Sequence, residues 1–380
     1  MTKRIILCLD GTWNQVRDPQ TVTNVVKLAQ TVRPLATDGT PQVVYYNSGV
    51  GTGDPIDKFL GGVFGRGLKS NVKRAYAFLS LNYEPGDEIY IFGFSRGAYT
   101  ARAVSGVVCA SGILQKQHFE QFELAWNFYL ERPERRAVGA SRAADDYDKH
   151  RDKLHTDARV RCVGVWDTVG SYGVPAGLGL GALARYFTSW MRGFHDTQIS
   201  DRVDIGLHAM ALDEKRRPFT PTFWTAKKDS PPSAHVEQVW FAGVHCNVGG
   251  GYRDTGLSDL ALRWMVARVT AVGWDLFKST IDFDTAVLKA KTNPSWRGIQ
   301  YRSEKGWPIS RLLPYHRPVF AGVSPKTGEE PVNERVHWSV LSRRGQQAPV
   351  DSAGEPTYAP VNLPRSIPPD RVASITLEEH

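Results

Sequence analysis

Short runs of apolar, β-branched residues alternate along the chain with longer stretches in which apolar residues recur at helical spacing. The apolar runs end in small or polar residues, a pattern that predicts buried strands. These runs are Arg4–Leu9, Val43–Tyr46, Glu88–Phe92, Val160–Val165 and Gln238–Ala242. The intervening pattern predicts helices at Leu68–Leu81 and Arg96–Cys109. Such alternation predicts an α/β fold with a mostly parallel central sheet flanked by helices.

Two stretches interrupt this alternation and are predicted as inserted, cap-like segments. The first, Gln115–Asp157, is polar, carries aromatic residues and is expected to be helical. The second, Gly173–Thr197, begins as a glycine-rich loop and continues through large apolar side chains. It could be a mobile lid, a face that contacts a membrane, or an ordinary packed helix. Residues 346–380 are proline-rich and predict an extended tail, so we expect one catalytic domain over residues 1–345 followed by this extension.

Composition and charge narrow the class of protein. Hydrophobic residues make up 41% of the chain and charged residues 23%, which supports a large core and excludes wholesale disorder. The formal net charge of +8 suits an anionic phospholipid surface, and no nucleic-acid-binding motif accompanies it. The apolar runs are too short for a signal peptide or a membrane span. We therefore expect the chain to be cytoplasmic when synthesised, with signal-peptide-independent export left open.

The most specific motif is Gly93-Phe94-Ser95-Arg96-Gly97, which matches the G-x-S-x-G pattern. It lies between a predicted strand and an alanine-rich predicted helix. In that context a sharp strand-to-helix turn lifts the serine hydroxyl clear of the sheet. The motif therefore predicts an α/β-hydrolase-like fold with Ser95 as the nucleophile. The backbone amide of Arg96, at the start of the helix, is expected to stabilise the oxyanion.

The loop after the first predicted strand, Asp10-Gly11-Thr12, allows two interpretations. Haloacid-dehalogenase phosphatases carry an aspartate nucleophile two residues before such an aspartate. Cys8 holds that position here, and a thiol would not form the aspartyl-phosphate. We therefore expect the amides of Gly11 and Thr12 to complete the oxyanion hole, while Asp10 either orients the loop or holds a cation.

A serine nucleophile needs a base and an acid that orients the base. Asp167 follows the fourth predicted strand, and His245 follows the fifth and enters a glycine-rich stretch. Because carboxyl ends of parallel strands meet at one edge of a sheet, both side chains are expected near Ser95. Asp167 could instead cap a turn, and a lone histidine is often structural. We favour Asp167 as the acid and His245 as the base.

Three further residues compete for supporting or catalytic roles. Asp254 lies on the glycine-rich stretch and could replace Asp167 as the acid. His208 is expected on a helix with an apolar face, in a core or supporting role. His337 comes late in the chain, where many hydrolases of this fold carry their base. No clustered metal-ligand motif is present and the four cysteines are far apart, so we expect no metal ion and no cofactor.

Five motifs in a fixed order resemble those of one family, the α/β-hydrolase domain-of-unknown-function family whose studied members are phospholipase effectors of bacterial type VI secretion. The motifs are Leu9-Asp-Gly-Thr-Trp-Asn14, Ser48-Gly-Val-Gly-Thr52, Gly93-Phe-Ser-Arg-Gly-Ala-Tyr99, Val165-Trp-Asp-Thr-Val169 and Gly243-Val-His-Cys-Asn-Val-Gly-Gly-Gly251. The resemblance spans about residues 3–345. It implies a Ser–Asp–His triad, carried onto Ser95, Asp167 and His245, and esterase activity on glycerophospholipid acyl chains.

The leading hypothesis is thus a serine esterase or lipase, plausibly a phospholipase of the A type. Its expected partners are an ester or phospholipid substrate and, transiently, a membrane surface, without nucleic acid. The alternatives are a cytosolic esterase acting on soluble substrates and a non-catalytic module that binds lipid or protein with the same fold. The oligomeric state is not indicated by the sequence.

Overall fold

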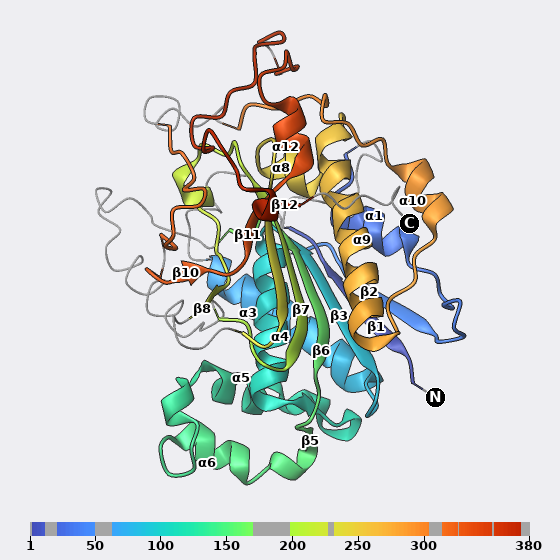
Figure 1. The fold of residues 1–380 in the computed structure, drawn as a ribbon. Helices are drawn as coiled ribbons and strands as arrows, with labels where there is room; N and C mark the ends of the chain where they lie inside the picture. Colours follow the sequence, from blue (N-terminus) through green and yellow to red (C-terminus); the bar gives the residue numbers. More distant parts are fainter. Residues whose placement is uncertain are drawn as a thin grey trace.

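A central sheet with helices on both faces dominates the computed structural model, which describes residues 2–11, 21–49, 63–169, 198–226, 232–303, 314–325, 327–351 and 353–373 (Figure 1). Two separate groups of buried apolar side chains lie on the two faces of the sheet. The first group joins the sheet to helices α1 and α9, and the second joins it to α3 and α4. The sheet therefore separates two cores, as expected for a parallel α/β fold.

Within the described residues the main sheet has eight strands, and all neighbouring pairs are parallel. The strand order is β12-β11-β9-β7-β6-β3-β1-β2. The bounds are β1 Arg4–Leu9, β2 Gln42–Asn47, β3 Glu88–Phe94, β6 Val160–Trp166, β7 Val203–Ala211, β9 His235–Phe241, β11 Glu334–His337 and β12 Val372–Ala373. The chain places β2 on one side of β1 and β3 on the other, so the direction of strand addition reverses between β1 and β3. Ligand sites in open parallel sheets lie outside the carboxyl ends of the strands at such a reversal.

The helices pack through apolar faces. In α1, for example, Thr23 caps the first turn by accepting a hydrogen bond from the Val26 amide, and Val25 and Leu28 are fully buried. The α-helices are α1 Asn24–Thr31, α3 Val63–Asn82, α4 Arg96–Ser111, α5 Phe122–Leu130, α6 Arg142–Asp148, α8 His245–Gly249, α9 Gly256–Phe277, α10 Thr285–Lys291 and α12 Trp338–Arg343. Short 3₁₀ turns are η1 Lys116–Gln121, η2 Pro133–Arg135, η3 Arg151–Lys153, η4 Arg217–Phe219 and η5 Pro369–Arg371. Two small antiparallel pairs complete the fold: β4 Ile113–Leu114 with β5 Leu154–His155, and β8 Thr225–Ala226 with β10 Glu330–Pro331.

The five strands and two helices predicted from the sequence are confirmed, with small differences at their ends. One central element differs. The structure places His208 on strand β7, so its expected placement on a helix is wrong. The strand is buried along almost its whole length, and its second half contains Leu207, Ala209 and Met210 instead of β-branched residues. Burial between β6 and β9, and not local propensity, therefore determines this strand.

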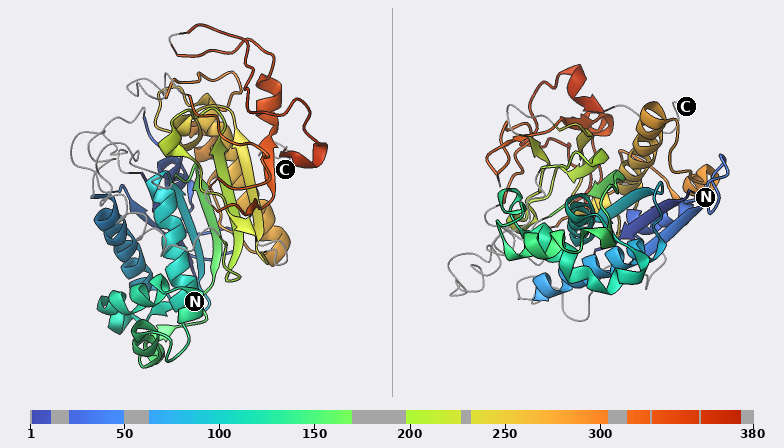
Figure 2. Two further views of the ribbon diagram at one scale, coloured as in Figure 1. Left: turned by 90° about the vertical axis from the view of Figure 1, so that its left-hand side faces the viewer. Right: turned by 90° about the horizontal axis from the view of Figure 1, so that it is seen from below.

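The first inserted segment lies far from the predicted nucleophile. The β4–β5 pairing closes its base, and the hydroxyl of Tyr147 donates to the carbonyl of Ser111 at the last residue of α4. Ser95 precedes the first residue of the same helix. Figures 1 and 2 show α5 and α6 at the end of the molecule opposite α8 and α12. In contrast to the expectation of a cap, this insertion thus packs at the amino ends of the strands. The second predicted insertion, Gly173–Thr197, lies outside the described residues.

The proline-rich tail packs onto the rest of the molecule. Tyr358 and Leu363 are buried in the core on the α9 side of the sheet. The tail then enters β12, which pairs with β11 and adds the eighth strand of the sheet. The extension predicted after residue 345 therefore contributes to the sheet and to a core.

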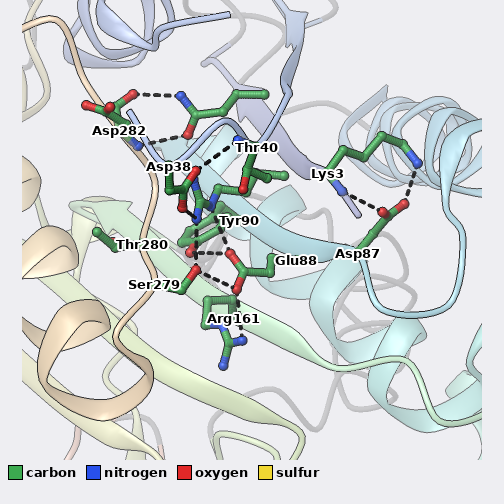
Figure 3. Close-up of polar contacts among 12 residues, drawn as sticks. Lys3, Asp38, Thr40, Asp87, Glu88, Tyr90, Arg161, Ser279, Thr280 and Asp282 are labelled. Atoms are coloured by element: carbon green, nitrogen blue, oxygen red, sulfur yellow. Dashed lines mark hydrogen bonds and ion pairs between the residues drawn. The ribbon is translucent and has the colours of Figure 1, made fainter. Parts of the chain in front are cut away.

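Partly buried ion pairs connect the amino ends of the strands (Figure 3). Nε of Arg4 in β1 donates to Oε2 of Glu88 in β3 at 3.0 Å, and the Arg161 guanidinium in β6 donates to Oε1 of the same carboxylate at 3.1 Å. The Ser279 hydroxyl, beyond α9, donates to that oxygen at 3.0 Å. Burial would raise the pKa of Glu88, but the hydrogen bond from Arg4 and the two guanidinium charges lower it below its usual value. Ion pairs to Glu88 thus link β1, β3 and β6 at this end of the sheet.

Candidate active site

Ser95 occupies a strained turn between β3 and α4. Its backbone has φ 57° and ψ −119°, and its amide donates to the Trp166 carbonyl of β6 at 3.1 Å. The flanking glycines permit this turn. A Cβ atom on Gly93 would lie 2.4 Å from the Gly97 carbonyl oxygen, and one on Gly97 would lie 2.0 Å from the Leu9 carbonyl oxygen. The strand-to-helix elbow therefore requires both glycines, as a nucleophile elbow does.

Asp167 follows β6 directly, next to the strand that leads to Ser95. It is fully buried and has a positive φ of 42°. Its amide donates to the Ala209 carbonyl of β7 at 2.7 Å, and its Oδ1 accepts from the Ala211 amide at 2.9 Å. Its Oδ2 lies 2.6 Å from Nδ1 of His245. The carboxylate is thus fixed by backbone contacts on one oxygen and bonds an imidazole through the other.

His245 is the first residue of the short helix α8, which begins after β9. Its amide donates to Oε2 of the buried Glu214 at 3.2 Å. Its imidazole packs between two aromatic rings, with centroid distances of 4.7 Å to Phe94 and 5.0 Å to Phe219. Because Phe94 immediately precedes Ser95, the imidazole lies beside the elbow. The structure thus brings His245 and Asp167 together next to the turn that carries Ser95.

The electrostatics of this pair favour a neutral imidazole. Burial lowers the pKa of His245 below its usual value, although the hydrogen bond and charge of Asp167 act in the opposite direction. The Arg216 charge lowers the pKa further. A neutral imidazole that donates from Nδ1 to Asp167 keeps the lone pair on Nε2 for a proton. The arrangement can therefore serve general-base chemistry near neutral pH.

Arg317, which the sequence did not indicate, holds the other side of the Asp167 carboxylate. The side chain is fully buried. Its two terminal nitrogens donate to Oδ1 at 2.6 Å and to Oδ2 at 3.0 Å. Burial alone would raise the pKa of Asp167, but the Arg317 charge and the His245 hydrogen bond hold it well below its usual range. No motif surrounds Arg317 in the chain, so only the folded structure reveals this contact.

Asp10, at the carboxyl end of β1, orients its own loop. Oδ1 accepts from the Gly11 amide at 2.7 Å. Oδ2 accepts from the hydroxyls of Thr23 at 2.6 Å and Tyr46 at 3.1 Å. Of the two roles expected for Asp10, the contacts match orientation of the loop. They also direct the Gly11 amide to this carboxylate, whereas an oxyanion was expected as its partner.

Arg96 and Thr12 complete the residues expected at the oxyanion hole. Arg96 is the first residue of α4, so its amide lies at the positive end of the helix dipole. Burial lowers the pKa of its guanidinium to about 10. Thr12 lies outside the described residues.

His208 supports the loop that follows Asp167. Its Nε2 accepts from the Thr168 amide at 3.1 Å, and Nδ1 lies 3.4 Å from the side-chain oxygen of Gln238. Burial lowers the pKa of this imidazole to about 3, which keeps it neutral and able to accept at Nε2. His208 therefore contacts the backbone next to the buried acid.

His337 and Asp254 have other partners. Nδ1 of His337 lies 2.7 Å from the Ser339 hydroxyl, at the start of α12, and burial lowers the pKa of the imidazole to about 3. Oδ1 of Asp254 accepts from the amides of Gly256 and Ile299, each at 3.1 Å. Each side chain therefore bonds to nearby groups of its own, and the structure does not bring the two together as an acid–base pair.

A cavity of about 420 Å³ lies beside α8. It is lined by the loop after β7, the segment around Tyr301 and the proline-rich tail, and its wall includes Asp213, Glu214, Val244 and Tyr358. The tail thus helps to form a hollow next to the residues that hold His245.

The described ranges contain neither a candidate metal cluster nor a helix suited to span a membrane. No three His, Cys, Asp or Glu side chains there are grouped as metal ligands. No described helix combines the length and apolarity required to cross a bilayer.

Two solved structures are similar to the chain. One is an uncharacterized protein from Pseudomonas aeruginosa, with a TM-score of 0.48 and 18% identity over 77% of this chain and 49% of that one. The other is the Tle1 effector bound to the VgrG spike from the Type 6 secretion system, with a TM-score of 0.37 and 18% identity over 67% and 52%. The matched part is about half of each of those chains.

Sequence comparisons identify the family. The uncharacterized protein YEL023C of Saccharomyces cerevisiae is 29% identical over 263 residues, which are 64% of this chain and 35% of that protein. The chain thus spans about a third of the length of this curated relative. The family model for the catalytic domain of Tle1-like type VI secretion phospholipase effectors matches residues 3–268. This range covers well over half of the chain and contains Ser95, Asp167 and His245, and the chain therefore belongs to the family of Tle1-like phospholipase effector catalytic domains.

Proposed function

We propose that this protein is a serine hydrolase that cleaves carboxylic esters, with glycerophospholipid acyl esters as its substrates. One observation carries the proposal: the buried 2.6 Å contact between Asp167 and His245, beside the elbow that carries Ser95. A neutral, oriented imidazole next to a serine at a strand-to-helix elbow is the arrangement that activates a hydroxyl for nucleophilic attack.

In the proposed mechanism Ser95 Oγ attacks the ester carbonyl while His245 Nε2 takes the hydroxyl proton. His245 then donates this proton to the leaving alcohol. In the second half, His245 takes a proton from a water molecule that attacks the acyl-enzyme, and it returns that proton to Ser95 Oγ as the carboxylic acid leaves. Asp167 orients the imidazole and stabilises its charged form. The amide of Arg96, at the N-terminus of α4, is proposed to bind the oxyanion, with Thr12 as a further candidate donor.

The family and the charge of the chain support lipid as the substrate class. The family model describes catalytic domains of phospholipase effectors. The formal net charge of +8 favours transient contact with an anionic membrane surface. We propose cleavage at an acyl ester, as in phospholipases of the A type, because the chemistry of a serine nucleophile suits a carboxylic ester.

A fluorophosphonate probe tests the chemistry directly, because it reacts with activated serines. We expect labelling of the wild-type chain and loss of labelling and ester hydrolysis in Ser95→Ala, with unchanged thermal unfolding. Ser105→Ala, at a buried serine further along α4, is the control and should still be labelled. A wild-type chain that is folded but not labelled would instead favour a non-catalytic binding module.

Vesicles test the substrate class. We expect acyl release from anionic phospholipid vesicles to exceed the hydrolysis of dispersed short-chain esters, and vesicle binding to weaken as salt rises. Efficient hydrolysis of soluble esters with no acyl release from vesicles would favour an esterase of soluble substrates.

A further inference from the structure

We infer that Arg317 is a positioning residue of the active site, which fixes the Asp167 carboxylate and balances its charge so that His245 remains a neutral, correctly oriented base. This inference rests on the proposed function. It adds to the three expected catalytic residues a fourth side chain, contributed by a segment that lies beyond the family-matched residues 3–268.

The Arg317 guanidinium contacts the carboxylate with both terminal nitrogens. Each of these nitrogens also donates to a backbone carbonyl: one to Ala211 at 2.6 Å, at the end of β7, and the other to Phe219. A planar fork with four acceptors allows little rotation of either group. The plane of the Asp167 carboxylate, and with it the direction in which Oδ2 meets His245, is therefore set by Arg317.

The same contacts determine the charge around the imidazole. A buried carboxylate without a cation would strongly favour a protonated His245. The other charged groups that act on His245 are Glu214 and Arg216, which form an ion pair with each other at 2.8 Å. The neighbouring His208 is buried and neutral. Arg317 is thus the cation that pairs directly with the orienting acid, and its removal should make the imidazole more basic.

The tail secures the segment that carries Arg317. Nδ2 of Asn362 donates to the Arg317 carbonyl and to the Leu212 carbonyl, each at 3.1 Å. It therefore links the segment around Arg317 to the end of β7, where Ala211 also contacts the guanidinium. The extension thereby contributes to the geometry of the site without reaching the imidazole itself.

A merely structural role for Arg317 would produce a different result from a positioning role, and a second buried arginine provides the matched control. Arg343 is also fully buried, but it donates to the backbone carbonyls of Trp296, Gly298 and Pro349. Replacing either arginine by methionine removes a buried guanidinium. Only Arg317→Met removes one that contacts Asp167.

The experiment compares Arg317→Met, Arg317→Lys and Arg343→Met with the wild-type chain. Steady-state kinetics on a soluble ester give kcat, KM and the acid limb of the pH profile. Nuclear magnetic resonance of the histidine ring gives the pKa of His245 without requiring turnover. Circular dichroism and thermal unfolding check folding, and Arg317→Lys, which keeps the charge, provides a second variant if the methionine variant does not fold.

For Arg317→Met we expect kcat to fall by about 10- to 100-fold with KM little changed. The acid limb and the His245 titration should both move to higher pH, by about one unit. Arg317→Lys should move the titration less, because it keeps the charge but loses the fork. Arg343→Met should leave the titration unchanged.

Two results would overturn the inference: a folded Arg317→Met with wild-type kcat and His245 titration, or the same shift in Arg343→Met. If Arg317→Met does not fold, a wild-type titration and kcat in Arg317→Lys would count equally against it. A wild-type chain that cleaves no ester and is not labelled at Ser95 would refute the proposed function, and the His245 titration would still decide whether Arg317 controls the imidazole.

Discussion

The strands β1, β3 and β6 carry polar residues at or next to both ends, and the two ends differ in how these residues are held. At the amino ends, Arg4 and Arg161 both form ion pairs with Glu88 across the strands. At the carboxyl ends, Ser95 and Asp167 follow β3 and β6, and both have left-handed backbone conformations. Positive φ at a non-glycine residue costs free energy and persists where surrounding structure enforces it. The amino ends are thus arranged for stability, whereas the carboxyl ends retain strain beside the proposed chemistry.

The comparison also concerns what each charge contacts. The carboxylate of Glu88 has two guanidinium partners and two hydroxyl partners, from Ser279 and Tyr90. The carboxylate of Asp167 has one guanidinium and one imidazole. An imidazole can exchange a proton near neutral pH and a guanidinium cannot. At the carboxyl ends, the buried Asp167 carboxylate therefore contacts a group that titrates near neutral pH. At the amino ends, the guanidinium partners of Glu88 do not titrate in that range.

The largest expected effect comes from substitutions at the carboxyl ends of the strands. Replacing His245 by alanine or Asp167 by asparagine should each reduce kcat about 10³- to 10⁴-fold, because the first removes the base and the second disturbs its tautomer. The double variant should lose little more than either single variant, since these groups act as a unit. Ester hydrolysis and thermal unfolding, measured on each variant, separate a loss of catalysis from a loss of folding. Full activity in His245→Ala combined with loss in His337→Ala would reverse the assignment of the base.

A substitution at the amino ends of the strands should lower stability without lowering kcat. In Glu88→Gln both guanidinium groups lose one carboxylate partner, while Arg4 keeps Asp38 and Arg161 keeps Asp204. We expect the free energy of unfolding to fall by about 1–3 kcal/mol while kcat stays unchanged. Urea unfolding at neutral pH measures this loss. A variant with normal stability and reduced kcat would contradict the division between the two ends.

The pH dependence of stability sharpens the same prediction. Because the pKa of Glu88 is lower in the folded chain than in the unfolded chain, its contribution is present above the unfolded value of about 4.3. The contribution is lost as pH falls through the folded pKa. The difference in stability between wild type and Glu88→Gln should therefore shrink on acidification.

A smaller effect is expected in the pH profile of activity. Burial lowers the pKa of His245, so the imidazole remains neutral at pH values at which an exposed histidine is already protonated. The acid limb of kcat/KM should then have its midpoint below about 6.5, the usual histidine value. A midpoint clearly above that value would mean that the charge of Asp167 outweighs burial in determining the basicity of His245.

The sequence predicted one part of this site well because its signals are local. The apolar runs of β1, β3 and β6 identify buried strands, and Gly93 and Gly97 are needed for a close approach that a sequence motif records. Parallel strands bring their carboxyl ends together, so the proximity of Asp167 and His245 could be expected before the fold was known.

Other parts depend on contacts that local sequence does not encode. Strand β7 lacks β-branched residues in its second half, so its conformation follows from burial between two neighbours. Arg317 meets Asp167 across 150 positions of sequence, from a segment without regular structure. Nothing in its immediate neighbours distinguishes it from a surface arginine. The pairing becomes visible only when the tail and the end of β7 are packed together.

The smallest expected effect concerns Asp213, a carboxylate at the carboxyl end of the sheet that differs from both Glu88 and Asp167. It follows β7 and lies in the wall of the cavity beside α8. Burial raises its pKa to about 6, although hydrogen bonds from the Gly243 amide at 2.6 Å and the Tyr358 hydroxyl at 2.8 Å act against this. Its folded pKa thus lies above the unfolded value of about 3.9, the reverse of Glu88.

The reversed shift reverses the expected pH dependence. Below about pH 4, Asp213 is protonated in both states and its ionisation costs nothing; as pH rises through about 6, the folded state must accept a buried charge and stability falls. In Asp213→Asn the amide oxygen can still accept from Gly243 and Tyr358, but no charge forms. We expect this variant to match the wild type near pH 4 and to exceed it by about 1 kcal/mol near pH 8, because partial exposure screens the charge. Urea unfolding at the two pH values measures the difference in the free energy of unfolding between this variant and the wild type. This difference should grow with pH, as it does for Glu88→Gln, but here the variant is the more stable protein. Lower stability of Asp213→Asn near pH 8 would mean that the Asp213 charge is itself stabilising, and that this carboxylate belongs with the paired charges of the amino ends.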